Sequence, residues 1–163
     1  AYGEEHDAFR DSVRKFYERE AVPHLDRWEQ EGLVEPAFWR KAGEAGLLCP
    51  TMPEAYGGLG LDFGFNAVVN EEHSYVGCPA GFTLQSDIVA DYILAYGSEE
   101  QKRAYLPKAV TGELILAIAM TEPGAGSDLQ GVRTTARKDG NHYVLNGSKT
   151  YISNGQTADL VVV

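Results

Sequence analysis

The sequence predicts an α+β protein in which helices come first and strands follow. Up to about residue 113, apolar residues recur at helical spacing between proline and glycine breaks. From residue 114 onward the pattern changes to short apolar or alternating runs separated by glycine-containing turns. These observations predict two regions, a helical region over residues 1–113 and a strand-rich region over residues 114–163.

The first two helices are marked by apolar faces and by proline. Phe9, Val13 and Phe16 share one helical face and Pro23 ends their segment, so a helix is expected over about residues 3–21. A short second helix is expected to begin at Pro36, which suits a first helical position, and to end near Gly46.

The rest of the helical region is divided by breaks. Two prolines and three glycines over residues 49–62 predict a long loop. Helices are then expected over residues 64–75 and 82–95, separated by a break at residues 77–81. Ser98 with Gln101 forms a capping-box pattern that opens a last helix, which is expected to reach about Val110.

Several short strands are expected after that. The apolar run over residues 114–120 has the character of a buried strand. Residues 143–145 and 148–153 read as a hairpin joined by Asn146-Gly147, and Asp139-Gly140 is a second hairpin signal. The run over residues 160–163 reads as a strand with no turn after it, which leaves an unpaired sheet edge.

Composition excludes several classes of function. The net charge of −10 disfavours a nucleic-acid or anionic-membrane surface. No apolar run approaches the roughly 20 residues of a membrane span. The two cysteines and four histidines show no metal-ligand spacing, so no metal site and no disulfide framework are expected, and a reducing compartment fits best.

The most informative segment joins the apolar run to a turn rich in glycines and hydroxyls. Backbone N–H groups in such a turn can approach a phosphate-bearing cofactor closely, and short polar side chains can meet a heteroaromatic edge. An ordinary strand-to-loop turn is the alternative, while the Gly-x-Gly-x-x-Gly and phosphate-loop spacings are absent. The candidate residues are Ile118, Ala119, Met120, Thr121, Glu122, Pro123, Gly124, Ala125, Gly126 and Ser127, followed by Asp128.

A second motif decides between these alternatives. Residues 120–130, together with the segment Asn-Gly-Ser-Lys-Thr-Tyr-Ile-Ser-Asn-Gly at 146–155, resemble the signature of the acyl-CoA dehydrogenase family. The resemblance extends upstream through residues 53–60, Glu71-Glu72 and residues 97–102, in the order and approximate spacing of the family. It therefore covers nearly the whole chain.

The resemblance implies a fold and a reaction. Residues 1–113 would form an N-terminal α-helical domain and residues 114–163 the opening of a β-barrel-like middle domain, with a C-terminal helical domain lying outside this chain. Members of the family use FAD to convert fatty acyl-CoA thioesters to trans-2-enoyl-CoA. Their catalytic base is a glutamate in the C-terminal part, so we expect the base downstream of Val163 and assign no catalytic residue here. Glu122 is expected to belong to the framework of the cofactor loop.

The resemblance also assigns the cofactor-binding residues. Residues 118–127 would line the flavin, with Thr121 at the isoalloxazine and Gly126 and Ser127 at the turn near the pyrophosphate. Ser127 would also contact the pantetheine arm of the substrate. Tyr151, Ile152 and Ser153 occupy the aromatic, aliphatic and hydroxyl positions against the flavin, where many members carry tryptophan or phenylalanine first and threonine last.

Substrate length, partners and location are less closely constrained by the residues. The small residues around Pro79-Ala80-Gly81 resemble the long-chain type, although a plain interhelical turn is an equal alternative. The resemblance implies electron-transfer flavoprotein as electron acceptor, a homotetramer, and a bacterial cytoplasm or mitochondrial matrix. Three other functions stay open: a same-fold oxidase such as an acyl-CoA oxidase or nitroalkane-oxidising flavoenzyme, a non-catalytic FAD or acyl-CoA binding protein, and a structural domain.

Overall fold

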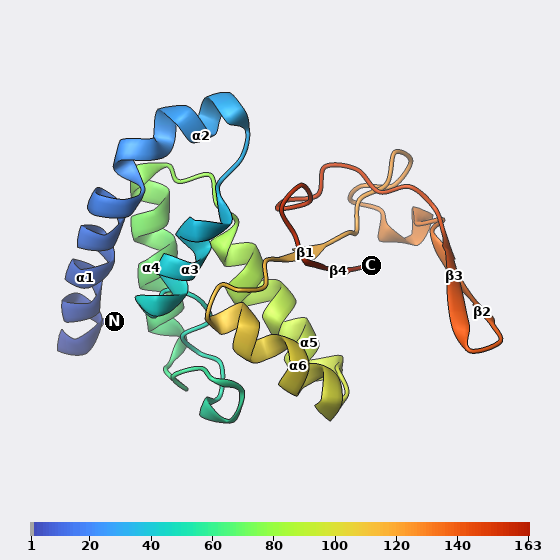
Figure 1. Cartoon of the computed structure of the whole chain (residues 1–163), viewed down its shortest axis with the longest axis horizontal. Helices are drawn as coiled ribbons and strands as arrows, with labels where there is room; N and C mark the ends of the chain where they lie inside the picture. The colour runs from blue at the N-terminus through green and yellow to red at the C-terminus, as the bar shows by residue number, and fades with distance from the viewer. Residues whose placement is uncertain (1) are drawn as a thin grey trace.

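The computed structural model describes residues 2–163. Helices occupy the chain up to Val110 and strands begin at Leu116, which confirms the predicted α+β class (Figure 1). The helices are α1 (Glu4–Glu20), α2 (Leu25–Glu31), α3 (Pro36–Glu44), α4 (Phe63–Val76), α5 (Ala90–Tyr96) and α6 (Glu99–Val110). The strands are β1 (Leu116–Ile118), β2 (Thr135–Asp139), β3 (His142–Asn146) and β4 (Leu160–Val162). Within the described residues, no helix is both long and apolar enough to cross a membrane.

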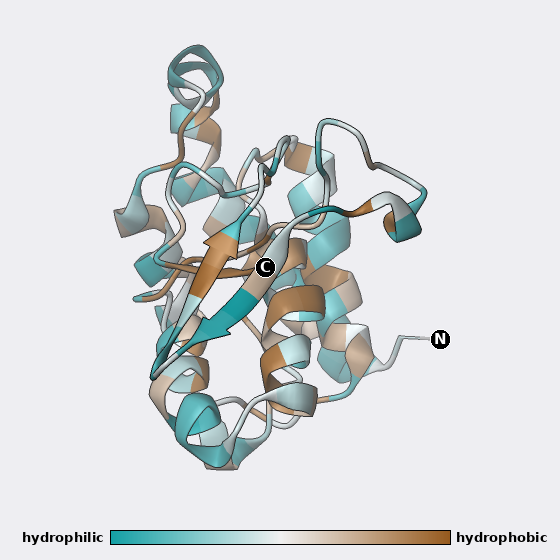
Figure 2. Ribbon diagram, turned by 90° about the vertical axis from the view of Figure 1, so that its right-hand side faces the viewer, coloured by the Kyte–Doolittle hydropathy of each residue, from teal (hydrophilic) through white to brown (hydrophobic). Residues whose placement is uncertain are grey.

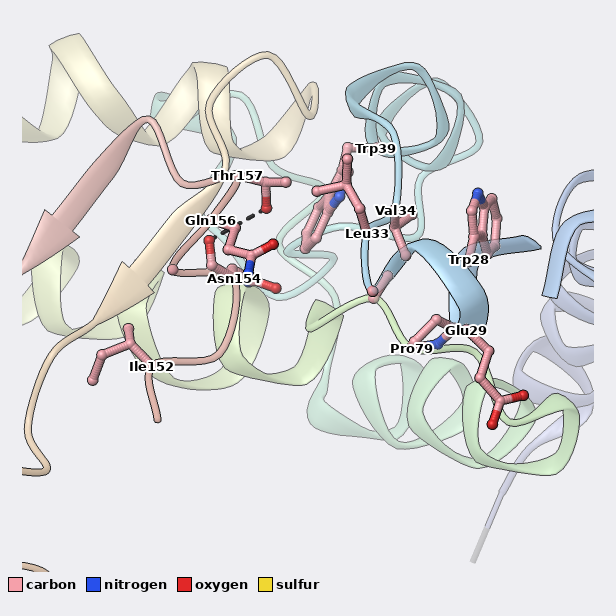
Figure 3. Close-up of a pocket in the computed structure, with 13 residues that line it drawn as sticks. Trp28, Glu29, Leu33, Val34, Trp39, Pro79, Ile152, Asn154, Gln156 and Thr157 are labelled. Atoms are coloured by element: carbon pink, nitrogen blue, oxygen red, sulfur yellow. Dashed lines mark hydrogen bonds between the residues drawn. The ribbon is translucent and has the colours of Figure 1, made fainter. Parts of the chain in front are cut away.

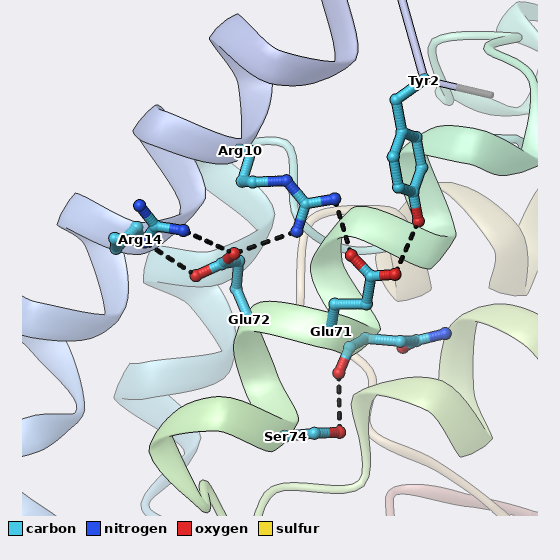
Figure 4. Close-up of polar contacts among 7 residues, drawn as sticks. Tyr2, Arg10, Arg14, Glu71, Glu72 and Ser74 are labelled. Carbon is cyan, nitrogen blue, oxygen red and sulfur yellow. Dashed lines mark hydrogen bonds and ion pairs between the residues drawn. The ribbon is translucent and has the colours of Figure 1, made fainter.

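Helix α1 lies beside α4, and a group of ion pairs joins them (Figure 4). The carboxylate of Glu72 is almost fully buried and accepts hydrogen bonds of 3.0 Å from both Arg10 and Arg14. Arg10 also pairs with Glu71 at 2.6 Å, and the hydroxyl of Tyr2 donates to Glu71. The apolar face of α1 that the sequence predicts is buried below this group, with Val13 and Phe16 in the main core.

Helix α2 was not expected from the sequence. It has only seven residues, its N-cap His24 makes no side-chain capping bond, and it follows directly after Pro23 in a 3₁₀ turn. Local signals for a helix are therefore weak. Trp28 stabilises it by lying fully buried against Phe38 of α3, with ring centroids 4.8 Å apart.

The helix expected over residues 82–95 is present but contains a π-helical segment, Leu84–Val89, before α5. Three consecutive polar side chains in it form hydrogen bonds with four other parts of the chain. Gln85, fully buried, donates to the carbonyl of Ala109 in α6 and accepts from the N–H of Leu116 in β1. Ser86 accepts from the N–H of Cys49 in the long loop. Asp87 accepts from two asparagines of α4. The segment thus ties the helices to the first strand.

Strand β4 runs parallel to β1, with Leu116 opposite Leu160. The expectation of a last strand without a partner is therefore wrong, because β1 fills one of its edges. Leu116 belongs to a second apolar cluster with Val89 and Leu106, against which Leu160 is packed. This cluster holds the two-stranded sheet on α5 and α6 (Figure 1).

The hairpin lies at Asp139-Gly140, and the hairpin expected at Asn146-Gly147 is wrong. Strand β2 pairs antiparallel with β3, Asp139 faces His142, and Gly140 supplies the left-handed turn residue with φ of 64°. Gly147 instead lets the backbone pass close to Thr134, since a Cβ at position 147 would lie 2.1 Å from Oγ1 of Thr134. The hairpin stands away from the helices (Figure 1), and the hydrophobic residues of β3 are exposed (Figure 2).

Candidate functional site

The first motif forms a tight turn at the end of β1. Ala119 donates to the carbonyl of Val162, which extends the pairing of β1 with β4 by one bond of 2.7 Å. Glu122 and Ala125 then exchange backbone hydrogen bonds of 2.9 and 3.1 Å, so that Pro123 and Gly124 form the corner between them. A Cβ at Gly124 or Gly126 would meet no atom within 4 Å, so the space beside the Cα atom of each glycine is open.

The structure brings the second motif directly against the first. The N–H of Thr150 donates to the carbonyl of Thr121 over 3.0 Å. The ammonium of Lys149 donates to the carbonyl of Met120 and to Oε1 of Glu122, each over 2.9 Å. Two segments that are about 25 residues apart in the sequence therefore form one site.

Glu122 is the anchor of this site. The residue is 7 % exposed, and its carboxylate accepts hydrogen bonds from the N–H groups of Arg133 and Thr134 as well as from Lys149. Hydrogen bonding from Thr134, then from the Arg133 N–H and the Lys149 ammonium, lowers the pKa of Glu122 to about 2. A carboxylate held so firmly in its ionised form is a weak base, and its oxygens are already occupied.

The residues after Thr150 do not form the expected strand. Tyr151 and Asn154 both adopt left-handed backbone conformations, with φ of 56° and 61°. Asn154 anchors this turn, because its side chain donates to the carbonyl of Leu116 over 3.0 Å and accepts from the N–H of Gly81 over 3.2 Å. Sequence reasoning missed this role of Asn154, although an Asn-Gly pair is a known signal for left-handed turns.

The turn presents Tyr151 to solvent, where 93 % of the residue is exposed. Ser127 and Ser153 are exposed as well, and neither hydroxyl is hydrogen-bonded to another of the described residues. An aromatic plane and two free hydroxyls thus stand at the surface of the site without protein partners.

A pocket of about 450 Å³ lies where the second motif meets the helices (Figure 3). Trp28 and Trp39 come from α2 and α3, Pro79 and Ala80 from the break after α4, and Ile152 from the second motif. The polar rim includes Glu29, Asn154, Gln156 and Thr157. The structure therefore places the break at residues 77–81 beside the residues expected to contact the cofactor.

Neither cysteine lines the pocket. Cys49 and Cys78 are both buried and unbridged, and burial raises the pKa of their thiols to about 12 and about 11. No group of three or more His, Cys, Asp or Glu side chains within residues 2–163 is placed to hold a metal ion.

Comparison with known proteins identifies the family. Residues 3–113 match the acyl-CoA dehydrogenase N-terminal domain, and residues 117–163 match the middle domain of the same family. The chain belongs to the acyl-CoA dehydrogenase family. The resemblance seen in the two motifs is confirmed.

The relatives are considerably longer than this chain. It is 53 % identical over 163 residues to the mitochondrial long-chain specific acyl-CoA dehydrogenase of Sus scrofa, covering 99 % of the chain and 38 % of that protein. It is 41 % identical over 164 residues to the mitochondrial isovaleryl-CoA dehydrogenase of Bos taurus, again covering 38 % of the relative.

Solved structures of acyl-CoA dehydrogenases share the fold of this chain. The acyl-CoA dehydrogenase from Geobacillus kaustophilus superposes with a TM-score of 0.96 at 56 % identity, covering 99 % of this chain and 43 % of that one. An acyl-CoA dehydrogenase from Bacillus anthracis, solved in complex with FAD, superposes with a TM-score of 0.88 at 38 % identity, covering 99 % of this chain and 28 % of the other.

Proposed function

We propose that the full-length protein is an FAD-dependent dehydrogenase that converts fatty acyl-CoA thioesters to trans-2-enoyl-CoA. The observation that carries this proposal is the hydrogen-bonded junction between the two family motifs, formed by Thr150 with Thr121 and by Lys149 with Met120 and Glu122. The junction supports a site built jointly by both motifs. We keep residues 1–113 and 114–163 as the proposed division into domains.

The residues present fit FAD. The open space beside Gly124 and Gly126 leaves room for phosphate oxygens to approach the backbone of this turn, and the exposed ring of Tyr151 can pack against a planar heterocycle. The remaining proposed contacts are Ile118, Ala119, Met120, Thr121, Glu122, Pro123, Ala125, Ser127, Ile152 and Ser153. FAD, when bound, would supply a two-electron acceptor for the β-hydrogen of the substrate.

The residues of this chain would bind and orient FAD and the acyl-CoA substrate. The free hydroxyl of Ser153 can donate to the flavin edge and stabilise negative charge there, while the hydroxyl of Ser127 can bond the phosphate region and the pantetheine arm. We propose that the general base comes from a residue outside residues 1–163. Glu122 is the carboxylate of the first motif, and its pKa of about 2 and its three donors make it unsuited to remove a proton.

Flavin content tests the cofactor assignment. The full-length protein is expected to carry noncovalent FAD, and Ser127→Ala or Ser153→Ala should each weaken its binding by about 0.5–1.5 kcal/mol, the value of one hydrogen bond. Ser12→Ala on α1 is the control, because Ser12 is exposed and far from the motifs in the sequence. A purified protein with no flavin absorbance that takes up none from added FAD would contradict the proposal.

We further propose a preference for long acyl chains. The long-chain specific relative and the pocket lined by the small residue Ala80 support it, and the isovaleryl-CoA relative represents the short-chain alternative. Anaerobic bleaching of the flavin by acyl-CoAs of increasing length is the measurement. Ala80→Leu, which fills the pocket, should shift the preference to shorter chains, whereas Ala95→Leu on an exposed face of α5 should not. Strongest bleaching with C4 substrates would refute the long-chain preference and leave the reaction class intact.

The electron acceptor, assembly and location follow from the same proposal. We infer electron-transfer flavoprotein as the acceptor, a homotetrameric assembly, and either a bacterial cytoplasm or a mitochondrial matrix. Relatives named as mitochondrial support the second location, and bacterial relatives support the first. Rapid reoxidation of the reduced flavin by oxygen would instead indicate a same-fold oxidase.

A further inference from the structure

Lys149 joins the two motifs through its side chain. Its ammonium is shared between the carbonyl of Met120 and the carboxylate of Glu122, at 2.9 Å from each. The side chains of Lys149 and Glu122 are 15 % and 6 % exposed, so solvent screens this ion pair only weakly. Surface ion pairs contribute little, whereas a pair shielded to this degree fixes geometry and balances a charge that would otherwise be isolated.

Among the donors to the Glu122 carboxylate, Lys149 is the one that carries a positive charge. The other donors to this carboxylate are the N–H groups of Arg133 and Thr134, which are dipoles and carry no net charge. The side chain of Arg133 forms no ion pair with Glu122, although its N–H is bonded there. Without Lys149 the carboxylate would remain in place, directly next to Thr121, with its negative charge uncompensated.

We propose that Lys149 is a positioning residue for the flavin site, which holds the two motifs together and neutralises Glu122 beside the flavin. This inference rests on the proposed function. Removing the ammonium has two consequences. The carbonyl of Met120 and the main chain at Thr121 lose a restraint, which loosens the surface that would contact FAD. The uncompensated carboxylate also opposes the negative charge that a flavin gains on reduction, so the bound flavin becomes harder to reduce.

Four variants of the full-length protein separate these effects: Lys149→Met, Lys149→Arg, Glu122→Gln, and Lys149→Met combined with Glu122→Gln. Lys102→Met is the matched control, because the Lys102 side chain is 18 % exposed and also pairs with a glutamate, yet lies on α6. The measurements are the dissociation constant of FAD from titration of the apoprotein and the midpoint potential of the bound flavin.

Lys149→Met is expected to weaken FAD binding at least about tenfold and to make the potential more negative. Lys149→Arg should restore part of both, because it keeps the positive charge. In the double variant the potential should return toward that of the wild type while FAD binding stays weak, since the isolated charge is gone but the restraint is not rebuilt. Lys102→Met should change neither quantity.

The possible outcomes are distinct. A wild-type protein that binds FAD, together with a Lys149→Met variant of unchanged affinity and potential, overturns the inference. A potential that shifts equally in Lys149→Met and in the double variant overturns the role of the charge. If circular dichroism shows that Lys149→Met is unfolded, the Glu122→Gln variant decides, provided that it is folded. Weaker FAD binding by Glu122→Gln supports the role of the contact between Lys149 and Glu122, and unchanged FAD binding overturns it. A wild-type protein that binds no FAD refutes the proposed function instead.

Discussion

At the residue scale, Glu72 and Glu122 are both nearly buried carboxylates that keep their charge through different donors. Glu72 faces two guanidinium groups, and Glu122 faces one ammonium and two backbone N–H groups. The sequence marked both as parts of family segments, but it could not reveal these partners, because they come from positions between 11 and 62 residues away. The difference in donors assigns Glu72 to the packing of helices and Glu122 to the candidate site.

Glu72→Gln should lower the free energy of unfolding by about 2 kcal/mol at neutral pH, because it leaves two arginines of α1 without their buried counter-charge. Urea unfolding of the full-length protein measures the change. Glu71→Gln is the matched control, since that neighbouring carboxylate is exposed and its loss should matter less. Equal losses in the two variants would contradict this explanation of the contact between α1 and α4.

The pH dependence of stability has a definite sign at the same residue. Burial by itself would raise the pKa of Glu72, but hydrogen bonds from Arg14 and Arg10 outweigh it, so the pKa lies below its ordinary value of 4.5. The stabilisation is therefore complete above about pH 4.5 and is lost as the pH falls through the lowered pKa of the folded state. The difference in unfolding free energy between wild type and Glu72→Gln should shrink in acid, and a difference that is constant from pH 7 to pH 3 would exclude this linkage.

At the scale of elements, local signals predicted most helices and failed where packing decides. The capping box at Ser98 is present, with Ser98 Oγ accepting from the N–H of Gln101 and Gln101 bonding back to the N–H of Ser98. The prediction of a hairpin at Asn146-Gly147 was wrong, because Gly147 lets the backbone pass close to Thr134. No local sequence pattern reveals that contact. Helix α2 and the π-helical segment likewise depend on tertiary contacts, through Trp28 and Gln85.

The π-helical segment gives a prediction of its own. Gln85→Leu should destabilise the protein by about 2–4 kcal/mol, because the carbonyl of Ala109 and the N–H of Leu116 would both remain buried without their partner. Thermal or urea unfolding of the full-length protein is the measurement. Gln130→Leu, at an exposed position, is the control and should have little effect. A Gln85→Leu variant as stable as the wild type would show that water or a shift of the backbone replaces both bonds.

At the scale of the whole molecule, the helical body positions the site through a small number of links. Gln85 joins the π-helical segment to the start of β1, and Asn154 joins the second motif to Gly81 and to Leu116. The sequence predicted the two motifs that the structure brings into contact, because each motif is contiguous, whereas the roles of their residues toward a flavin stay predictions. It could not predict their contact at Thr121 and Thr150, since that contact depends on how β1 and β4 lie on α5 and α6.

The isolated 163-residue chain should not be a competent dehydrogenase. Three of the side chains proposed to contact the flavin, those of Ser127, Tyr151 and Ser153, are exposed, with Tyr151 93 % exposed, and the apolar residues Tyr143 and Leu145 of β3 are 69 % and 57 % exposed. A flavin held on one side only is poorly shielded from water, and an open apolar hairpin favours association in solution. Glu122 is occupied by three donors and has a pKa of about 2, so we expect that it does not serve as the base.

The test is to express residues 1–163, supply FAD and acyl-CoA, and follow reduction of an artificial electron acceptor beside the full-length protein. We expect no turnover above background from the isolated chain, even when gel filtration and circular dichroism show that it is folded. Glu122→Gln in the full-length protein is the companion variant, and it should alter FAD binding without abolishing proton removal from the substrate. Turnover by the isolated chain close to that of the full-length protein would place the base within these 163 residues, because proton removal from the thioester cannot proceed at that rate without one.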